Sequence, residues 1–568
     1  MDSVRGMSGW VMMRAAAAAL TAALAGGSAL AFEFDTGNPD VSIRWDNTVR
    51  YNLGVRVEGR DSKIGNSAVS DEGTYSFDRG DIVTSRFDLL SEFDFVYKRN
   101  YGFRVSGAAW WDPAYTDNSK SNPNPPLVNI PSYINHKYTS YINRYYQGPS
   151  AELLDAFVFG KWNLGEVPTT LKVGRQSLYW GESLFLGGNL HSIAYAQNPL
   201  DLQKGFATPG VEAKELFRPL GQVSATAQLT ETFSLGAQYF WEWQEFRYPE
   251  GGTYTGAVDF VFNGPQRQFL SNALGFATRG SAIEPTQNGD WGVAARWSPA
   301  WLDGTVGLYY RNYSDKLPQT LLTRVGVNSS IYNLIYKGNI DLWGISLAKN
   351  IAGISVGAEF SYRHNTPLNA QVLGNASAAG PIASGSTPGP VGDTYHGLVN
   401  FVGILPKTPV FDTANYGLEL TWSQWSKVTS GQNLFQAVGF PGCTVQGRPG
   451  DKWDGCTTKN FWGLGLAFTP TWFQVFPGVD LQAPITFATG LSGNAATVFG
   501  GNESNGNYTI GVGADIYQKY RIDLKYIDWF GRYKTGPGPN GEQVTSQNGF
   551  TTLLKDRGFI SLTLKATF

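Results

Sequence analysis

Residues 558–568 read GFISLTLKATF, and this segment is the clearest indicator of the fold. Its apolar and polar side chains alternate, the two sets being Ile560, Leu562, Leu564, Ala566 and Phe568 against Ser561, Thr563, Lys565 and Thr567. A period of two is typical of a β-strand with two different faces. Such a strand would invite aggregation if it were left unpaired, so we expect a sheet that closes on itself. Closure, an apolar outer face and a polar inner face together predict a transmembrane β-barrel.

The same alternation runs through residues 41–57, towards the other end of the chain. A second pair of alternating segments meets at Lys98-Arg99-Asn100, which predicts a hairpin with a short turn. Short turns then alternate with long polar segments, the asymmetry of outer-membrane barrels. Counting the segments predicts an all-β fold of about eighteen antiparallel strands, with about sixteen as the alternative. The least certain pair lies in residues 412–440, where we place a return strand through Leu434 and Val438.

The amino terminus predicts export from the cytoplasm. Arg5 and Arg14 flank an apolar run that leads to Ala29-Leu30-Ala31, the pattern of a signal peptide. The run is about 15 residues long, below the ~20 residues that a membrane-spanning helix needs. We therefore expect residues 1–31 to be a cleaved signal peptide and residues 32–568 to form a single barrel domain. The formal net charge of −2 gives no indication of nucleic acid as a partner.

Charged side chains on the polar faces of the first and last strands are candidates for lining a channel. They are Arg44, Asp46, Arg50, Arg56, Arg86, Asp88, Glu92, Asp94, Arg104, Arg521, Asp523, Lys525 and Lys565. Because their signs are mixed, they could form a cross-strand ladder of ion pairs that stiffens the wall. The functional alternative is a track that binds a polar group of a solute.

Arg175 does not fit the pattern, because the alternation that turns Leu171 and Val173 towards lipid also turns Arg175 outward. An arginine at the bilayer midplane costs ~2 to 4 kcal/mol on the lipid face of a barrel. We therefore expect a β-bulge near Gly174, or the opposite facing, so that Arg175 lines the channel.

Several long loops are more apolar than solvated loops need to be. The apolar segments are Phe269, Leu270, Ala273 and Leu274 at helical spacing, Ile331, Leu334 and Ile335 at the same spacing, and the run LVNFVGIL at residues 398–405. They predict either a lid of loops packed on one another or an entrance for an apolar solute. Residues 181–219 are the first candidate for a loop that constricts the channel, through Glu212, Lys214, Glu215 and Arg218.

Cys443 and Cys456 lie in a stretch that contains Gly and Pro, and in an exported protein they predict a disulfide within one loop. The four histidines, His136, His191, His364 and His396, form no metal-binding or catalytic motif. We therefore expect no enzyme activity, no catalytic residues, no metal and no cofactor.

Two segments, LKVGRQSLYWGESLFLGGN (171–189) and NPLDLQKGFATPGVEAKELFRP (198–219), resemble the Gram-negative outer-membrane family catalogued as domain of unknown function (DUF) 1302. The chain departs from the family pattern at HSIAYAQ (191–197). The resemblance implies an outer-membrane barrel that handles hydrophobic compounds alongside partner proteins of the envelope. The segment ending in Phe568 is similar to the signal that the barrel-assembly machinery recognises.

These observations lead to the expectation of a passive outer-membrane channel, surrounded by membrane lipid, that prefers hydrophobic or amphipathic small molecules. One rival is a general porin for small hydrophilic solutes, which would conduct without preference. The other is a component of an envelope transport complex or a barrel enzyme. Sequence leaves the solute, the direction of transport and the oligomeric state open.

Overall fold

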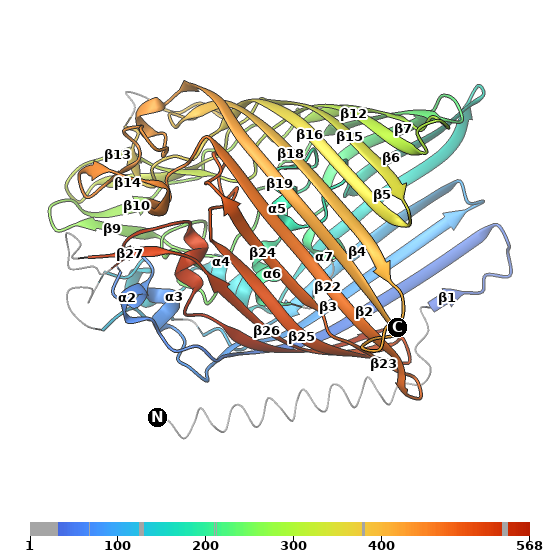
Figure 1. Cartoon of the computed structure of the whole chain (residues 1–568), viewed down its shortest axis with the longest axis horizontal. Coiled ribbons are helices and arrows are strands. Elements are labelled where there is room, and N and C mark those ends of the chain that lie inside the picture. The colour runs from blue at the N-terminus through green and yellow to red at the C-terminus, as the bar shows by residue number, and fades with distance from the viewer. Residues whose placement is uncertain are drawn as a thin grey trace.

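The chain forms a closed antiparallel β-barrel with long loops at one end and short turns at the other, as a computed structural model shows (Figure 1). The structure describes residues 32–67, 69–116, 118–123, 130–209, 211, 213–377, 381–536 and 544–568. The predicted signal peptide, residues 1–31, lies outside the described residues. No helix in the described part of the chain is both long and apolar enough to cross a bilayer.

The wall has eighteen strand positions, as the alternation predicted. Its strands are β2 (Val41–Arg56), β3 (Ile82–Tyr97), β4 (Tyr101–Trp111), β5 (Ser150–Leu164), β6 (Val167–Gln176), β7 (Leu220–Gln228), β8 (Phe233–Phe240), β11 (Trp291–Trp297), β12 (Gly304–Tyr313), β15 (Ile340–Ile351), β16 (Ile354–Pro367), β18 (Val391–Leu405), β19 (Thr413–Ser430), β22 (Asn460–Phe476), β23 (Val479–Gln482), β24 (Ile485–Ser492), β25 (Gly506–Ile516), β26 (Tyr520–Phe530) and β29 (Phe559–Thr567). β23 and β24 share one position between β22 and β25. The short β1 (Phe32–Phe34) extends the wall beside the first residues of β2.

The barrel closes where β29 pairs antiparallel with β2. Arg50 lies opposite Lys565 and Thr48 opposite Thr567, so the polar faces of both strands point into the same lumen, as predicted. The backbone of Phe568 exchanges two hydrogen bonds with Asn47, of 2.7 and 2.9 Å. The last residue of the chain is therefore built into the closing seam.

The outer surface of the barrel is apolar and has two aromatic bands. Exposed aromatic side chains near the short turns are Tyr97, Tyr101, Trp162, Trp297, Trp301, Phe476 and Tyr517. Those near the long loops are Trp111, Trp241, Trp291, Trp343 and Trp462. Exposed aliphatic side chains between the bands include Leu89, Val105, Val158, Leu235, Leu308, Ile345, Ile510, Leu524 and Ile560. An apolar belt between aromatic girdles is the surface of a barrel that spans a membrane.

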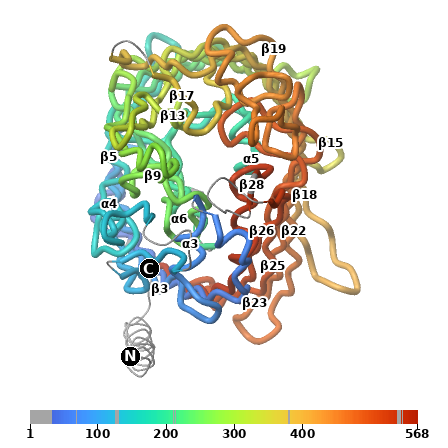
Figure 2. The backbone as a smooth tube through the Cα atoms, turned by 90° about the vertical axis from the view of Figure 1, so that its left-hand side faces the viewer, coloured from blue at the N-terminus to red at the C-terminus, as the bar shows by residue number. Residues whose placement is uncertain are grey.

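The long loops fold over their end of the barrel and carry short elements of their own (Figure 2). Five loop strands, in the order β17-β13-β14-β10-β9, form a second sheet. The loop strands are β9 (Arg267–Ser271), β10 (Gly275–Arg279), β13 (Gln319–Arg324), β14 (Ser330–Ile335), β17 (Gly374–Asn375), β20 (Thr444–Val445), β21 (Arg448–Pro449), β27 (Tyr533–Thr535) and β28 (Val544–Gln547). The helical turns are α2 (Ser62–Gly65), α3 (Asp71–Tyr75), η1 (Ile134–His136), α4 (Ser140–Ile142), η2 (Asn143–Gln147), α5 (Leu186–Asn189), α6 (Leu202–Ala207), α7 (Ala213–Leu216), η3 (Gln432–Leu434), η4 (Lys452–Asp454) and η5 (Phe550–Leu554).

Two of the predicted elements are wrong, and their errors compensate in the strand count. Residues 398–405, expected in a loop, belong to the wall strand β18, whose partners β16 and β19 flank it. The expected return strand through Leu434 and Val438 does not form; Leu434 ends the turn η3, and β19 pairs directly with β22. The run LVNFVGIL is apolar on both faces near the short-turn end, which hides its alternation.

The apolar loop segments with helical spacing are also strands. Residues 267–279 form the β9–β10 hairpin, and Ile331, Leu334 and Ile335 lie in β14. Leu334 and Ile335 are buried in small clusters with other loop residues, so one role of these segments is to pack the loops on one another. Short apolar runs fit a helix and a strand equally well, and here pairing between loops selects the strand.

Candidate functional site

The segment between β6 and β7 folds into the barrel instead of over its end. We call residues 177–219 the inner loop; all but Gly210 and Glu212 are described. Its turns α5, α6 and α7 lie within the outline of the wall strands in Figure 1. Irregular backbone at membrane depth needs partners for its polar groups, because lipid offers none. The wall supplies these partners from its inner face.

Two glutamates of the wall bind backbone N–H groups at the start of the inner loop. The carboxylate of Glu359 on β16 accepts from Glu182 N, from Ser183 N at 3.1 Å and from Ile193 N at 2.6 Å. On β19, the carboxylate of Glu419 accepts from Leu184 N and Phe185 N at 2.7 and 3.2 Å. Charge-assisted hydrogen bonds of this kind are stronger than neutral ones.

Two glycines allow the loop to approach these carboxylates so closely. A Cβ on Gly188 would lie 1.9 Å from Oε1 of Glu419, and one on Gly181 would lie 2.4 Å from Oε1 of Glu359. Gly181 also has a φ of +98°, which disfavours other residues. A larger residue at either of these two positions would therefore push the loop away from its carboxylate.

Arginines of the same wall bind the carbonyl groups of the inner loop. Arg311 on β12 donates from Nη1 to the carbonyls of Ile193 and Tyr195, both at 2.7 Å. Arg363 on β16 donates from Nη2 to the carbonyl of Ser192 at 2.9 Å. The loop's N–H groups thus face wall carboxylates while its carbonyls face wall guanidinium groups, so both kinds of backbone group are satisfied.

Two buried histidines also contribute to the contact between the inner loop and the wall. Nδ1 of His191 lies 3.0 Å from Nδ1 of His396 on β18, and Nε2 of His191 lies 2.7 Å from the carbonyl oxygen of Gly500. Residues 191–195 of the inner loop are therefore part of its contact with the wall.

The far end of the inner loop binds the opposite side of the barrel. Glu215 accepts two hydrogen bonds from Arg50 on β2, at 2.8 and 2.9 Å, and both side chains are buried. Lys214 pairs with Glu92 on β3 at 2.6 Å. Lys525 on β26 donates to the carbonyl of Pro209 at 2.8 Å. The inner loop therefore crosses the lumen from β12–β19 to β2, β3 and β26.

Of the four residues expected to constrict the channel, Lys214 and Glu215 form ion pairs with the wall strands β3 and β2. Arg218 points away from them and donates to the carbonyl of Glu245 at 2.9 Å and to Gln244. Glu212 lies outside the described residues. Glu359 and Glu419 were not predicted as site residues. Each lies between apolar neighbours in an alternating segment, and this pattern could have identified them as lumen-facing charges.

The predicted channel-lining side chains form a network of ion pairs on the inner face of β2, β3, β4 and β26. Arg104 contacts Glu92, Asp94 and Asp155, and Arg521 binds Asp515 and Asp523. The remaining pairs are Arg44–Asp46, Arg50–Asp88 and Arg86–Asp88. Arg56 is instead buried beneath the long loops, where it binds Asp556 and the carbonyls of Thr74 and Phe77. Most of these charges thus neutralise one another.

The prediction that Arg175 lines the channel is wrong. β6 keeps its register with both β5 and β7, so Arg175 shares the outward face of Val173 despite the φ of +132° at Gly174. The guanidinium lies one residue from the long-loop end of β6, where it pairs with Glu242 and donates to the carbonyl of Pro219 at 3.0 Å. The prediction rested on the free-energy cost of an arginine at the bilayer midplane. Arg175 avoids this cost because it lies at the rim of the barrel and pairs with a carboxylate.

Two cavities adjoin the inner loop. The larger, which we call the inner cavity, has a volume of about 380 Å³ and lies between the loop and the inner face of β3–β6. The smaller, about 30 Å³, lies at the long-loop end among aromatic side chains of separate loops, including Phe206, Tyr248, Phe262, Phe499 and Phe550. We call the smaller one the aromatic pocket.

A buried carboxyl ties the loops around the aromatic pocket to the inner loop. Glu250 accepts from Nε2 of Gln203 on α6 at 3.2 Å and from Gly264 N at 2.6 Å. Burial raises the pKa of Glu250 to about 8. The group is therefore protonated in the folded loops at neutral pH, where an exposed glutamate would be ionised.

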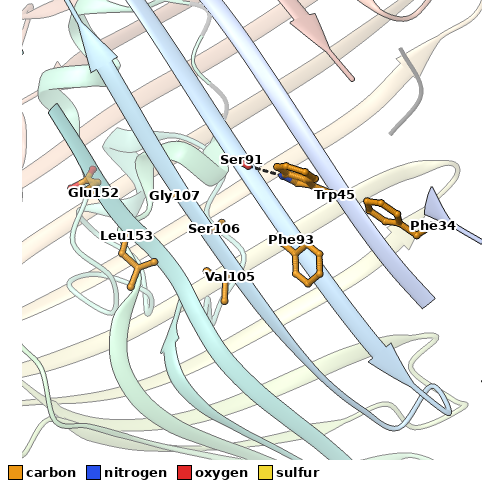
Figure 3. Close-up of a pocket in the computed structure, with 9 residues that line it drawn as sticks. All are labelled: Phe34, Trp45, Ser91, Phe93, Val105, Ser106, Gly107, Glu152 and Leu153. Carbon is orange, nitrogen blue, oxygen red and sulfur yellow. Dashed lines mark hydrogen bonds between the residues drawn. The ribbon is translucent and has the colours of Figure 1, made fainter. Parts of the chain in front are cut away.

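The outer surface carries a groove over the same strands that border the inner cavity (Figure 3). Its floor includes the small residues Ser91 and Gly107, and its sides include Phe34, Trp45, Phe93, Val105 and Leu153. Nε1 of Trp45 donates to Oγ of Ser91 at 2.8 Å, which satisfies this hydroxyl on the lipid-facing side. The groove is thus an apolar surface for lipid chains.

Cys443 and Cys456 form a disulfide within one long loop, as predicted for an exported protein. No group of three or more His, Cys, Asp or Glu side chains in the described residues could hold a metal ion. The features that distinguish this barrel are therefore the inner loop, its anchors and the two cavities.

Comparisons with solved structures found several barrels that align along most of the chain at low identity. The crystal structure of Acinetobacter baumannii OccAB4 aligns at 9% identity over 93% of this chain and 98% of that one, with a TM-score of 0.38. A BenF-like porin from Pseudomonas fluorescens Pf-5 aligns at 9% identity over 94% and 99%, with a TM-score of 0.39. Salmonella typhi OmpF in complex with daunomycin aligns at 7% identity over 94% and 100%, with a TM-score of 0.36. A search of curated proteins found no match.

The protein is a transmembrane β-barrel whose lumen is crossed by one of its own loops. It belongs to the family described as "Protein of unknown function (DUF1302)", whose sequence model matches residues 12–568.

Proposed function

We propose that the protein is an outer-membrane channel that passes small molecules passively and prefers hydrophobic or amphipathic ones. The observation that carries this proposal is the inner loop, which crosses the lumen and is bonded to both sides of it. An eighteen-strand wall is too wide for its own side chains to fill, so a loop in this position sets the size and chemistry of the passage.

Two features support the preference for apolar solutes. The aromatic pocket lies at the long-loop end, where a solute from outside would arrive, and the inner cavity combines apolar with charged side chains. A wide pore lined only by charges would instead suit ions and sugars. The aromatic pocket is small as it stands, so a solute would enter by displacing side chains of the long loops.

Planar-bilayer recordings test the proposal against the general porin. A specific channel gives small single-channel currents that an added amphipathic solute reduces, whereas a general porin gives large currents that the solute leaves unchanged. Uptake of a fluorescent apolar tracer into proteoliposomes checks transport directly. Hydrolysis of lipid esters by the purified barrel would favour an enzyme instead.

Location and assembly are part of the proposal. We place the barrel in the outer membrane of a Gram-negative bacterium, reached by signal-peptide export and inserted by the barrel-assembly machinery, which would recognise the segment ending in Phe568. Phe568→Asp should lower the amount of barrel in the outer membrane but leave the conductance of the inserted molecules unchanged. Co-purification with periplasmic proteins would indicate partners in an envelope complex.

A further inference from the structure

We propose that the inner cavity binds a small free molecule with a carboxylate at one end and an apolar body, and that the ammonium group of Lys172 receives the carboxylate. This inference rests on the proposed function and deepens it by naming the chemical class of the solute. It is carried by the shape of the wall, the charges around the cavity and the apolar side chains opposite them.

The cavity exists because the wall is irregular at this point. Val105 of β4 pairs with Ala156 of β5, and Gly107 pairs with Leu153, so β5 has one residue more than β4 between these pairs. This β-bulge turns both Leu154 and Asp155 towards the lumen, where alternation would allow only one of them. Bulges often occur beside binding sites because they redirect side chains.

One of the cations that line the cavity, Lys172, forms no ion pair with a described residue. Its five charged side chains are Glu92, Arg104, Asp155, Lys172 and Lys214. Arg104 and Lys214 form ion pairs with the two carboxylates. Among the described residues Lys172 makes no ion pair; its Nζ lies 5.4 Å from the ring centroid of Phe157. Among the charged side chains that line the cavity, the three cations thus outnumber the two carboxylates, and Arg104 also contacts Asp94, which is not part of the lining.

Lys172 reaches the cavity because of its place in β6. It lies opposite Phe159 of β5, on the inner face, while Val173 faces lipid. Lys161 lies on the same face of β5, opposite Thr170 and nearer the short turns. A carboxylate that dissociates from Lys172 and moves towards the short-turn end would thus next meet Lys161.

Apolar side chains complete the cavity. Leu90 and Leu154 come from the wall, Phe157 lies beside Lys172, and Leu178 and Phe217 come from the two ends of the inner loop. The volume of about 380 Å³ lies within the range of small-molecule sites, which are mostly apolar with a few polar groups that orient the ligand. A cation beside apolar walls selects an anionic amphiphile over an anionic sugar or a neutral hydrocarbon.

Calorimetric titration of the full-length barrel in zwitterionic nanodiscs tests the inference, with decanoate, decanol and decyltrimethylammonium as probes. We expect decanoate to bind, and Lys172→Gln to weaken it about tenfold, since a charge-assisted contact is lost. Binding of decanol should not respond to Lys172→Gln. Phe157→Ala should weaken both decanoate and decanol, because it removes apolar contact from either ligand.

Lys407→Gln is the matched control, because it removes a lysine from an exposed turn that pairs with Asp412 outside the cavity. Equal affinities for decanoate and decanol, or an unchanged decanoate affinity in Lys172→Gln, would overturn the inference. Mass spectrometry that finds an anionic phospholipid retained at the site would also overturn it, because the ligand would then come from the membrane. Bilayer recordings on the same variants keep the two proposals apart, since a conducting barrel without decanoate binding contradicts only this one.

Discussion

The two sides of strands β2–β5 face opposite environments although the same backbone carries both. On the outer side, Trp45, Phe93 and Val105 border an apolar groove, whereas on the inner side Glu92 and Arg104 border a charged cavity. A step of one residue along a strand is enough to move from lipid to a polar lumen. Alternation along the strands is enough to make the lipid-facing surface apolar. The surface that faces the lumen depends in addition on the inner loop, which packs against it.

The largest effect is expected from a variant that lacks most of the inner loop and keeps the wall strands. Replacing residues 186–215 with a short Gly/Ser linker should raise the single-channel conductance several-fold, because the inner loop then no longer crosses the lumen. Water can solvate the charges that the loop leaves behind. Trimming the exposed β20–β21 hairpin, residues 444–449, is the control and should leave the conductance unchanged. Equal conductance of both variants would show that the inner loop does not obstruct the passage.

A second test places the same lysine on either side of one strand. Val158 lies near the middle of β5 and is 58% exposed on the lipid side. Val158→Lys should lower the free energy of unfolding by ~2 to 4 kcal/mol, the cost of a charge near the bilayer midplane. The neighbouring variant Phe159→Lys faces the lumen and should cost less than Val158→Lys. Urea titrations of the two barrels in lipid vesicles compare them, and a smaller cost for Val158→Lys would contradict the assignment of the faces.

The anchoring of the loop can be tested at one carboxylate. Glu359→Ala leaves the N–H groups of Ser183 and Ile193 without their acceptor, which should destabilise the loop locally by ~1 to 3 kcal/mol. Amide hydrogen exchange of residues 182–193 should speed up accordingly. Glu231→Ala, in an exposed short turn, should not alter this exchange. If protection persists in Glu359→Ala, the loop is held by other contacts.

The smallest expected effect concerns pH and the loops around the aromatic pocket. Because burial raises the pKa of Glu250 to about 8, the loops are most stable below the ordinary glutamate pKa of 4.5 and lose stability as pH rises towards 8. The ratio of amide exchange rates in residues 245–264, wild type over Glu250→Gln, should rise about tenfold per pH unit between pH 5 and pH 7. A ratio independent of pH would show that Glu250 is not buried as a neutral acid.

Much of the wall could be predicted from sequence, because a strand with one face in lipid and one in water must alternate. The segments 41–57 and 558–568 predicted both the closure and the shared lumen face of Arg50 and Lys565, and the structure places these two residues opposite each other. The alternation failed at residues 398–405, where apolar residues occupy both faces. It was also misapplied at Arg175, since the expected penalty assumed the bilayer midplane, whereas the residue lies at the rim.

The site was predictable only in outline. Residues 181–219 were identified as a constricting loop from their mixture of apolar and charged residues, but their partners could not be deduced. Glu359 and Glu419 lie 166 to 235 residues further along the chain than the N–H groups they bind, and only closure of the barrel brings them together. Lys172 was not predicted, because alternation indicates which side chains face the lumen but not which of them border a cavity.

The bonds between the inner loop and both sides of the lumen also bear on the order in which the barrel can fold. The loop needs β2 and β3 from the beginning of the chain and β16, β18 and β19 from later parts, so its full set of bonds exists only once the wall has been completed. A half-built barrel would lack part of these bonds. The chain thus couples the placement of its inner loop to the completion of its circumference.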